Sequence, residues 1–409
     1  MLHKLSRIGI ISAIPAALLI CMLVTINIRL SKHFWTYSII SDGKGYYAYL
    51  PATFIYNDLN FNFRDSIEAR YNDAHNQADY RIEVEGHTAN KYFCGTALLQ
   101  TPFFLAGHLT AKLSGATADG YSKPYIVWTH IGAFFYLALG LYALRRFLLS
   151  YFPQPIAATS VVLIILFGTN LFYYAIAEPM MSHVYSFALV SCFMLQTRQW
   201  MQTGQNKSLL LMMLLLGLIA LVRPVNLLIA GWIFIEGQTT QQLLGRFQSV
   251  FKNFKLLLSS FLLFTGIIFI QFITWKIQTG HWYINSYGNE GFDFTSFHFT
   301  EFLFSYRKGL FVYTPLTLLA LGGFYYLYRN NKNKAILTAV FLLIVVYILS
   351  SWWMWFYGGS FGSRPMIEYL PVFALLLYFL ITAMKRQVSK ISLAAVLFIL
   401  VAFCQLQTL

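Results

Sequence analysis

The sequence predicts an all-α polytopic membrane protein with about 11 transmembrane helices and with juxtamembrane helices in its first outer loop. Hydrophobic residues make up 58% of the 409 residues and charged residues only 11%, whereas a soluble domain carries about 25% charged residues. Apolar runs close to the ~20 residues that a membrane-crossing helix needs recur along the chain. This composition excludes soluble, disordered and collagen-like proteins.

The first apolar run, residues 8–28, follows Lys4 and Arg7 and is longer than the apolar part of a signal peptide. We interpret it as an uncleaved first span with a cytoplasmic N-terminus. The region 208–236 is either two short spans or a helix pair broken around Arg223-Pro224. All runs are expected to form one transmembrane domain over 1–409, with no separate soluble domain. The later runs are 123–144, 154–172, 183–200, 208–222, 225–236, 255–275, 309–327, 335–353, 369–384 and 391–407.

Charge predicts the side that each gap faces. Cationic clusters occupy alternate gaps, and with Lys4 and Arg7 they hold 15 of the 29 Lys and Arg residues. Glu236 is the one acid on that side, which therefore carries the whole net charge of +14. The positive-inside rule makes this side cytoplasmic, so the charge needs no nucleic acid partner. The clusters are Arg145/Arg146, Arg198/Lys207, Arg246/Lys252/Lys255, Arg329/Lys332/Lys334 and Lys385/Arg386/Lys390.

Residues 92–113 are also long enough to cross a membrane. A crossing there would invert every later side and place the cationic clusters outside, so we expect this segment to lie on the outer surface. Its Gln100, His108 and Lys112 suit an interfacial helix. The first outer loop is then 30–122, and the other substantial outer loops are 276–308 and 354–368. Binding and catalytic residues commonly lie where loops meet on a rigid scaffold.

Asp42 opens the first outer loop's motif, SDGKGYYAYLP. A carboxylate at the boundary between water and lipid can serve as a general base when burial tunes its pKa. The alternative is that Asp42 caps the helix that follows, as Ser, Asp and Asn often do.

Arg364 ends the motif WWMWFYGGSFGSRP, which also contains Trp355 and Tyr357. Small residues followed by Arg suit a phosphate, because backbone N–H groups can approach it closely and a guanidinium can form two parallel hydrogen bonds to its oxygens. Alternatively, Arg364 anchors this loop to Glu368. Arg307 and Lys308 stand where another outer loop enters a span, and they either contact a lipid phosphate or extend to the membrane surface.

Three further residues lie at outer turns. Glu178 and His183 flank a short turn between two runs, and Arg223 ends another run. Two candidate ligands do not make a metal site, which needs three or four. The four cysteines are far apart and predict neither a disulfide framework nor a CxxC metal site. We therefore expect neither a metal nor another cofactor.

Together these features resemble the GT-C superfamily of polytopic glycosyltransferases, which includes protein O-mannosyltransferases and bacterial aminoarabinose transferases. Asp42 followed by Tyr46 and Tyr47 is similar to the family's acidic first outer loop, although the usual pair of adjacent acids is reduced to Asp42-Gly43. The WWMWFYGGSFGSRP stretch with Pro371 resembles the pattern W-x-GG-x-x-G-x-R…P of bacterial members. RKGLFVYTP resembles their kGL-x-x-Y-x-P segment, and Arg223-Pro224 their mid-chain Arg-Pro.

The resemblance implies a glycosyltransferase that moves a sugar from a polyprenyl-phosphate donor to a glycan, lipid or protein acceptor. The reaction would occur with inversion at the outer face of the cell (inner) membrane, among membrane lipids and without nucleic acid. Asp42 would be the general base, and Arg364 with Arg307 or Lys308 would bind the donor phosphate. The expected residues of the cavity or acceptor site are Tyr46, Tyr47, Glu178, His183, Arg223, Trp355 and Tyr357.

Two alternatives come from other classes. A transporter or flippase of lipid-linked glycans would need ions buried within the spans and a cavity reachable from both sides, and the apparent scarcity of such ions favours an enzyme. A non-catalytic membrane scaffold with a GT-C-like fold is the second alternative. The enzyme requires that Asp42 and Arg364 meet in one outer cavity, and a lateral opening of that cavity toward lipid would favour a transferase.

Overall fold

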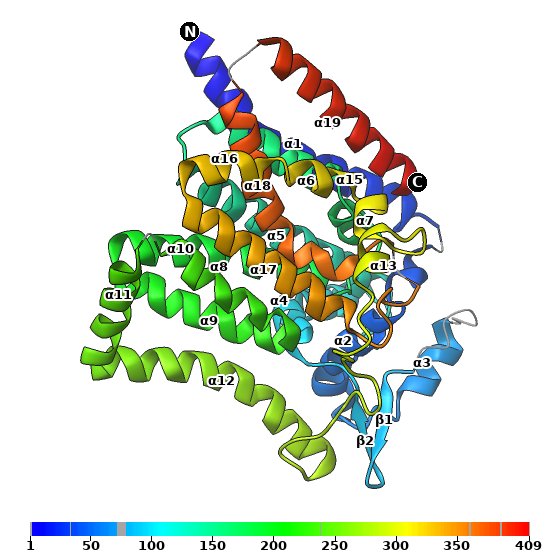
Figure 1. Ribbon diagram of the computed structural model, residues 1–409. Coiled ribbons are helices and arrows are strands. Elements are labelled where there is room, and N and C mark those ends of the chain that lie inside the picture. Colours follow the sequence, from blue (N-terminus) through cyan, green and yellow to red (C-terminus); the bar gives the residue numbers. More distant parts are fainter. Residues whose placement is uncertain are drawn as a thin grey trace.

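The computed structural model describes residues 2–32, 34–71, 79–237, 239–359, 361–384 and 387–408, with the side chains of 2–12 and 387–390 excepted. The described chain is mostly helical, as an all-α membrane protein should be (Figure 1). The predicted cytoplasmic side chains Lys4, Arg7, Lys385, Arg386 and Lys390 lie outside the described set, as does Ser360 of the GGSFGSR motif.

Each predicted apolar run forms helix. Within the described residues, five helices are long and apolar enough to cross a membrane, and four shorter apolar helices accompany them. The number of 11 crossings stays a prediction. The five are Lys123–Leu149 (α5), Phe254–Thr279 (α12), Lys332–Ser350 (α17), Arg364–Ala383 (η4 and α18) and Ile391–Thr408 in α19. The four are Ala13–Ile28 in α1, Pro155–Phe167 (α6), Asn206–Val222 (α9) and Pro224–Glu236 (η3 and α10).

Two predicted runs are interrupted. The run 154–172 continues beyond α6 only as the short helix α7 (Leu171–Ile176). The run 309–327 divides into α14 (Leu310–Tyr313), α15 (Pro315–Ala320) and α16 (Gly323–Asn330). Pro315 separates the first two, because a proline disfavours helical geometry at the preceding residue. Thr314 accordingly has φ −132° and ψ 65°.

The region 208–236 is two antiparallel elements. Helix α9 ends at Val222, and Arg223 is extended with φ −153° and ψ 108° because Pro224 follows it. The 3₁₀ helix η3 (Pro224–Gly231) and α10 (Trp232–Glu236) then return along the bundle. Glu236 consequently reaches Arg198, near the end of α8 (His183–Thr203), at 3.0 Å.

Glu236 forms a buried ionic cluster with Arg198, Lys334, Tyr151 and Trp232, which we call the Glu236 cluster. Glu236 is fully buried and lies 2.9 Å from Lys334, so residues from α8, α10 and α17 are joined at this end of the bundle. The sequence analysis assigned these charges to the cytoplasmic side and did not predict that they would be buried against one another. The sequence concealed the cluster because its charges are far apart in the chain.

The first outer loop contains helices, as expected, and also a β-hairpin that the all-α prediction missed. Strands β1 (Arg81–Val84) and β2 (His87–Asn90) pair antiparallel around Glu85 and Gly86. Both turn residues have positive φ, 51° and 80°, which is typical of a tight type I′ hairpin turn. The helical elements are η1 (Phe34–Ser38), α2 (Asp42–Pro51), η2 (Ala52–Tyr56), α3 (Arg64–Tyr71) and α4 (Gly95–Ser114).

Helix α4 occupies the segment expected to lie on the outer surface, and it packs against α2, α5 and α9. Gly95 permits this contact, since a Cβ there would lie 2.4 Å from the backbone nitrogen of Val222 at the end of α9. Two helices were not expected. The short helix α13 (Phe299–Phe304) lies in the predicted outer loop 276–308. Helix α11 (Thr240–Lys252) forms in a cationic gap and is capped by Thr239, whose hydroxyl accepts from the Gln242 amide at 3.1 Å. Figure 1 shows α11 linking α10 to α12 at one edge of the bundle.

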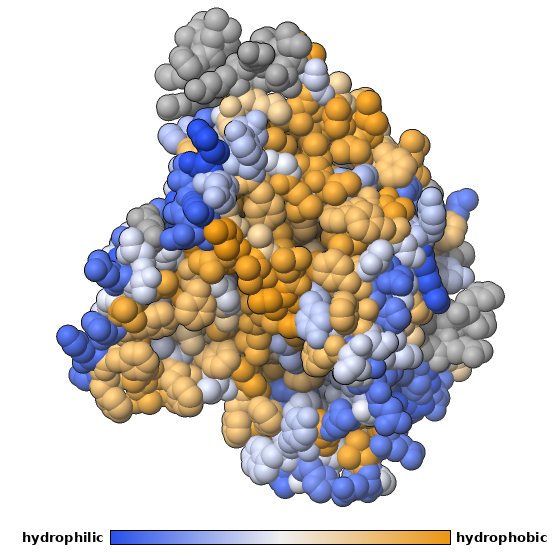
Figure 2. All heavy atoms as spheres, in the orientation of Figure 1, coloured by the Kyte–Doolittle hydropathy of each residue, from blue (hydrophilic) through white to orange (hydrophobic). Residues whose placement is uncertain are grey.

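The packed core runs through the middle of the bundle, where α18 is almost completely buried. Helices α12 and α19 lie at the periphery and expose large apolar side chains such as Phe261, Leu262, Phe398 and Ile399. Figure 2 shows a broad hydrophobic surface with hydrophilic margins, one along α11 and the other over α3 and the β-hairpin. This pattern suits a protein surrounded by lipid between two aqueous phases.

Candidate functional site

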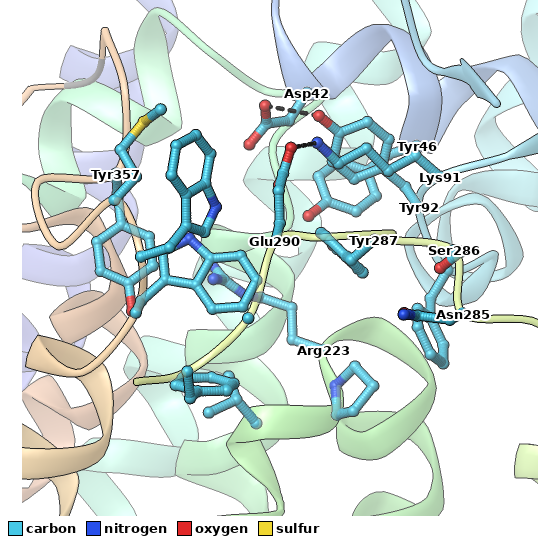
Figure 3. A pocket seen from close by; sticks show the side chains of 18 of the residues that line it. Asp42, Tyr46, Lys91, Tyr92, Arg223, Asn285, Ser286, Tyr287, Glu290 and Tyr357 are labelled. Carbon is cyan, nitrogen blue, oxygen red and sulfur yellow. Dashed lines mark hydrogen bonds and ion pairs between the residues drawn. The ribbon is translucent and has the colours of Figure 1, made fainter. Parts of the chain in front are cut away.

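A cavity of ≈490 Å³ lies where the three predicted outer loops meet the break between α9 and η3 (Figure 3). Its wall is largely aromatic, and five charged side chains line it: Asp42, Lys91, Arg223, Glu290 and Arg364. The lining segments are the start of α2, residues 91–93 after β2, residues 222–225, Trp275, residues 283–287 and 290–292, residues 352–354 and 357–358, and Arg364.

Asp42 and Arg364 meet in this cavity. The Oδ2 atom of Asp42 lies 2.8 Å from Nη2 of Arg364, and its Oδ1 atom accepts a hydrogen bond of 2.9 Å from the Tyr92 hydroxyl. The glycines of the DGKG motif allow this approach, because a Cβ at Gly45 would collide with the Tyr92 ring at 2.2 Å. The carboxylate thus pairs across the cavity instead of capping α2.

The environment keeps Asp42 ionised. Burial is the largest single influence and disfavours its charged form, but the Arg364 guanidinium, the Tyr92 hydroxyl and the more weakly acting Arg223 and His183 together hold the pKa of Asp42 below its ordinary value. Burial and the Asp42 charge raise the pKa of Tyr92, which therefore remains a hydrogen-bond donor. The carboxylate is consequently a fixed negative charge at neutral pH, and its basicity depends on its partnership with Arg364.

A second ionic group lies beside the first. The Oε1 atom of Glu368 is 3.0 Å from Nδ1 of His183 and 3.4 Å from Nη1 of Arg223. Glu368 and His183 are buried and do not line the cavity, whereas the Arg223 side chain does. Glu368 is not the partner of Arg364, which pairs with Asp42 instead. The alternative that Arg364 anchors its loop to an acid therefore stays open, with Asp42 as that acid. Arg364 and Glu368 both depend on η4 (Arg364–Tyr369), which carries Arg364 at its start and Glu368 one turn later.

Tyr46 and Tyr357 line the cavity as expected. The Tyr46 ring lies 4.9 Å from the ring of Tyr92. Tyr357 has φ 55°, and its hydroxyl donates to the Leu349 carbonyl at 2.9 Å. Figure 3 shows Asp42, Tyr46 and Lys91 on one side of the cavity and Arg223 entering from the other.

Tyr47 and Trp355 do not line this cavity, which corrects two expectations. Tyr47 lies on a buried side of α2, and its hydroxyl donates to the Gly120 carbonyl. Successive residues of a helix point about 100° apart, so Tyr46 and Tyr47 face different surroundings. Trp355 instead packs near the rings of His298 and Phe356.

The remaining predicted residues, Arg307, Lys308, Glu178 and His183, do not line the cavity. Arg307 is exposed and lies over the Phe356 ring at 3.4 Å. Burial and the nearby Arg364 charge lower the pKa of half-buried Lys308. Glu178 accepts from the Tyr173 hydroxyl at 2.8 Å, and burial raises its pKa. The Nδ1 atom of His183 contacts Glu368 and Arg223, as described above, and its ring packs against Tyr174.

Several site residues were missed from the sequence. Tyr92 holds Asp42, and Lys91 pairs with Glu290 at 2.6 Å across the cavity mouth, where Tyr287 and Trp275 also lie. Lys91 and Tyr92 directly follow the β-hairpin, which places them at the cavity. Because the hairpin was not predicted, these two residues were not predicted as site residues. A clustering of aromatic residues in the loop 276–308 was the available signal.

The described part of the chain holds no group of three or more His, Cys, Asp and Glu side chains arranged for a metal. The cysteines Cys21, Cys94, Cys192 and Cys404 are free. No protein-family model matches the chain, and no curated protein matches it either. The GT-C resemblance therefore stays a prediction based on short motifs, and the geometry of the cavity has to support any function by itself.

Proposed function

We propose that this protein is a glycosyltransferase that moves a sugar from a polyprenyl-phosphate donor to an acceptor hydroxyl. The observation that carries the proposal is that the Asp42 carboxylate lies in one cavity with two guanidinium groups, Arg364 and Arg223, among many aromatic side chains. Guanidinium groups suit a phosphate, aromatic faces suit the body of a sugar ring, and a carboxylate suits the proton of an attacking hydroxyl.

The position of the cavity fits a donor whose tail stays in lipid. Val222, Pro224 and Val225 of the cavity wall belong to the apolar α9 and η3 segments. Phe292 and Trp353 of the same wall are partly exposed to the outside. A polyprenyl chain can therefore lie along the apolar flank while its phosphate reaches the two arginines.

In the proposed reaction, the acceptor oxygen attacks the anomeric carbon from the side opposite the phosphate. The bond from the anomeric carbon to the phosphate oxygen breaks, and its electron pair leaves with the polyprenyl phosphate. Asp42 takes the proton of the acceptor hydroxyl, so the configuration inverts in a single displacement. The guanidinium groups, with Lys308 near Arg364, stabilise the charge that grows on the departing phosphate.

The test uses the purified protein in nanodiscs with polyprenyl-phosphate sugars and a mixture of glycan, lipid and peptide acceptors. We expect mass spectrometry to show loss of the donor, release of polyprenyl phosphate and a product heavier than an acceptor by one sugar residue. A protein that moves the intact donor between leaflets without breaking the sugar bond would instead be a transporter. If the protein neither releases a sugar from any donor of the panel nor moves a donor between leaflets, the result would favour a scaffold.

A further inference from the structure

The two arginines of the cavity differ in what already occupies them. Nη2 of Arg364 touches Asp42, which itself lines the cavity and must stay available to the acceptor. A phosphate bound at Arg364 would lie beside this carboxylate and be repelled by it. Arg364 is therefore poorly placed to be the main phosphate ligand.

Arg223 is occupied differently. Within the part of the chain that the structure describes, its polar contacts use Nη1 alone, with Glu368 at 3.4 Å and His183 at 3.3 Å. Both partners are buried behind the cavity wall. The remaining N–H groups of the guanidinium, on Nη2 and Nε, are left for a ligand in the cavity. Two parallel N–H groups match two oxygens of a phosphate.

The backbone makes Arg223 a rigid support. The extended conformation before Pro224 turns its side chain out of the α9 axis. Gly95 of α4 packs tightly against the backbone of Leu221 and Val222, so the end of α9 has little freedom to shift. His183 and Arg223 both contact the Oε1 atom of Glu368, and these contacts hold the guanidinium of Arg223 on the side away from the cavity.

We infer that Arg223 is the principal ligand of the donor's phosphate, that Glu368 and His183 are its positioning residues, and that Arg364 chiefly orients Asp42. The inference rests on the proposed function and refines it by giving the two arginines different roles. It reverses the assignment expected from the sequence, in which Arg364 binds phosphate and Arg223 faces the acceptor.

The test measures binding of farnesyl phosphate, which carries no sugar, to the protein in zwitterionic nanodiscs by native mass spectrometry. We expect Arg223→Gln to weaken binding about tenfold to 100-fold, the loss that follows from removing hydrogen bonds between charged groups. Arg223→Lys should recover part of it. Arg364→Gln should change affinity less than about threefold, and so should Lys91→Gln, a matched cation of the same cavity that is paired with Glu290.

Glu368→Gln separates positioning from simple charge. If Glu368 merely places negative charge near the phosphate, its removal should tighten binding, whereas loss of a positioning residue should weaken binding several-fold. Thermal unfolding of each variant shows whether it folds, and His183→Gln serves as the second probe of the same support. Weaker binding in His183→Gln with unchanged unfolding agrees with positioning.

Three results would overturn the inference: greater loss of binding in Arg364→Gln than in Arg223→Gln, tighter binding in a folded Glu368→Gln, or no farnesyl phosphate binding by the wild type. The sugar-transfer assay is independent of these measurements. If the wild-type protein transfers sugar but its binding of farnesyl phosphate depends on Arg364, the inference is rejected and the proposed function is kept. Absence of sugar transfer across the donor panel would reject the proposed function even if Arg223 binds farnesyl phosphate.

Discussion

The molecule contains two buried ionic groups that differ in how completely their charges are satisfied. In the Glu236 cluster, Oε1 of Glu236 accepts from the Tyr151 hydroxyl and from the Trp232 ring, and Oε2 accepts from Arg198 and Lys334. Each carboxylate oxygen of Glu236 thus accepts two hydrogen bonds. None of the residues in this cluster lines the cavity.

The cavity group, Asp42, Arg364, Arg223, Glu368 and His183, is less complete. Oε2 of Glu368 and Nε of Arg364 are buried and have no hydrogen-bond partner among the described residues. Leaving a buried polar atom unpaired costs about 1–3 kcal/mol. The fully paired Glu236 cluster is therefore expected to contribute chiefly to stability, whereas the cavity group, which lies at the proposed site, is expected to contribute chiefly to function.

The largest expected effect tests this contrast at the cavity. Asp42→Asn should reduce sugar transfer by about 10²–10⁴-fold in the protein that folds, because the acceptor proton loses its base. Turnover of the donor is the measurement. Asp58→Asn is the matched control, since Asp58 is hydrogen-bonded within its own loop to the amides of Asn60 and Asn62. Equal turnover in the two variants would remove Asp42 from the mechanism.

The Glu236 cluster should respond in stability instead. Glu236→Gln leaves Arg198 and Lys334 buried without their carboxylate and should cost about 3–5 kcal/mol of folding free energy. Thermal and denaturant unfolding in detergent measure this loss. Glu290→Gln breaks a partly exposed pair with Lys91 and should cost no more than about 1 kcal/mol. If both variants unfolded alike, the Glu236 cluster would not be a structural junction.

Arg364→Gln should shift the pH dependence of transfer. Arg364 lowers the pKa of Asp42 against the effect of burial, so the wild-type base stays ionised as the pH falls toward its depressed pKa. Without the guanidinium, burial remains and the pKa of Asp42 rises. The acidic limb of the kcat/KM profile should therefore move to higher pH, with the greatest loss of rate in acid. A limb that does not move would show that Arg364 does not tune Asp42.

Tyr92→Phe should have a smaller effect in the same direction. It removes one hydrogen bond to the ionised Asp42 and leaves Arg364 in place, so transfer should fall roughly 10–100-fold, as expected for a single hydrogen bond to a charged group of about 1.5–3 kcal/mol. The acidic limb should move slightly upward. A loss as large as that of Asp42→Asn would mean that Tyr92 itself takes part in proton transfer.

Tyr47→Phe should change least. Its hydroxyl donates to the Gly120 carbonyl inside a packed cluster, so stability should fall by about 1 kcal/mol and transfer per folded molecule should be unchanged. Tyr46→Phe provides the comparison from the neighbouring position, which lines the cavity. A specific loss of transfer in Tyr47→Phe would contradict the separation of these two tyrosines.

Much of the helical architecture follows from composition alone. Long apolar runs predict helices because only a helix can satisfy its backbone in lipid, and α5, α12 and α17 begin and end within a few residues of their runs. The β-hairpin and α11 were missed, because a four-residue strand and a 13-residue amphipathic helix leave weak signals beside such runs. Pro224 predicted the break at Arg223 but not the direction of the chain after it.

The sequence by itself determined that this chain is a helical membrane protein. It also singled out Asp42, Arg223 and Arg364, because each lies in a short local motif, SDGKGYY, Arg-Pro or GGSFGSRP, that can be read without knowing the fold. Only the tertiary structure decided the pairing: Asp42 with Arg364 and Tyr92, Glu368 with Arg223 and His183, and Tyr47 away from the cavity. The motifs led us to expect Asp42 and Arg364 in one cavity, but not the direct contact of 2.8 Å between them, because pairing depends on which distant segments pack together.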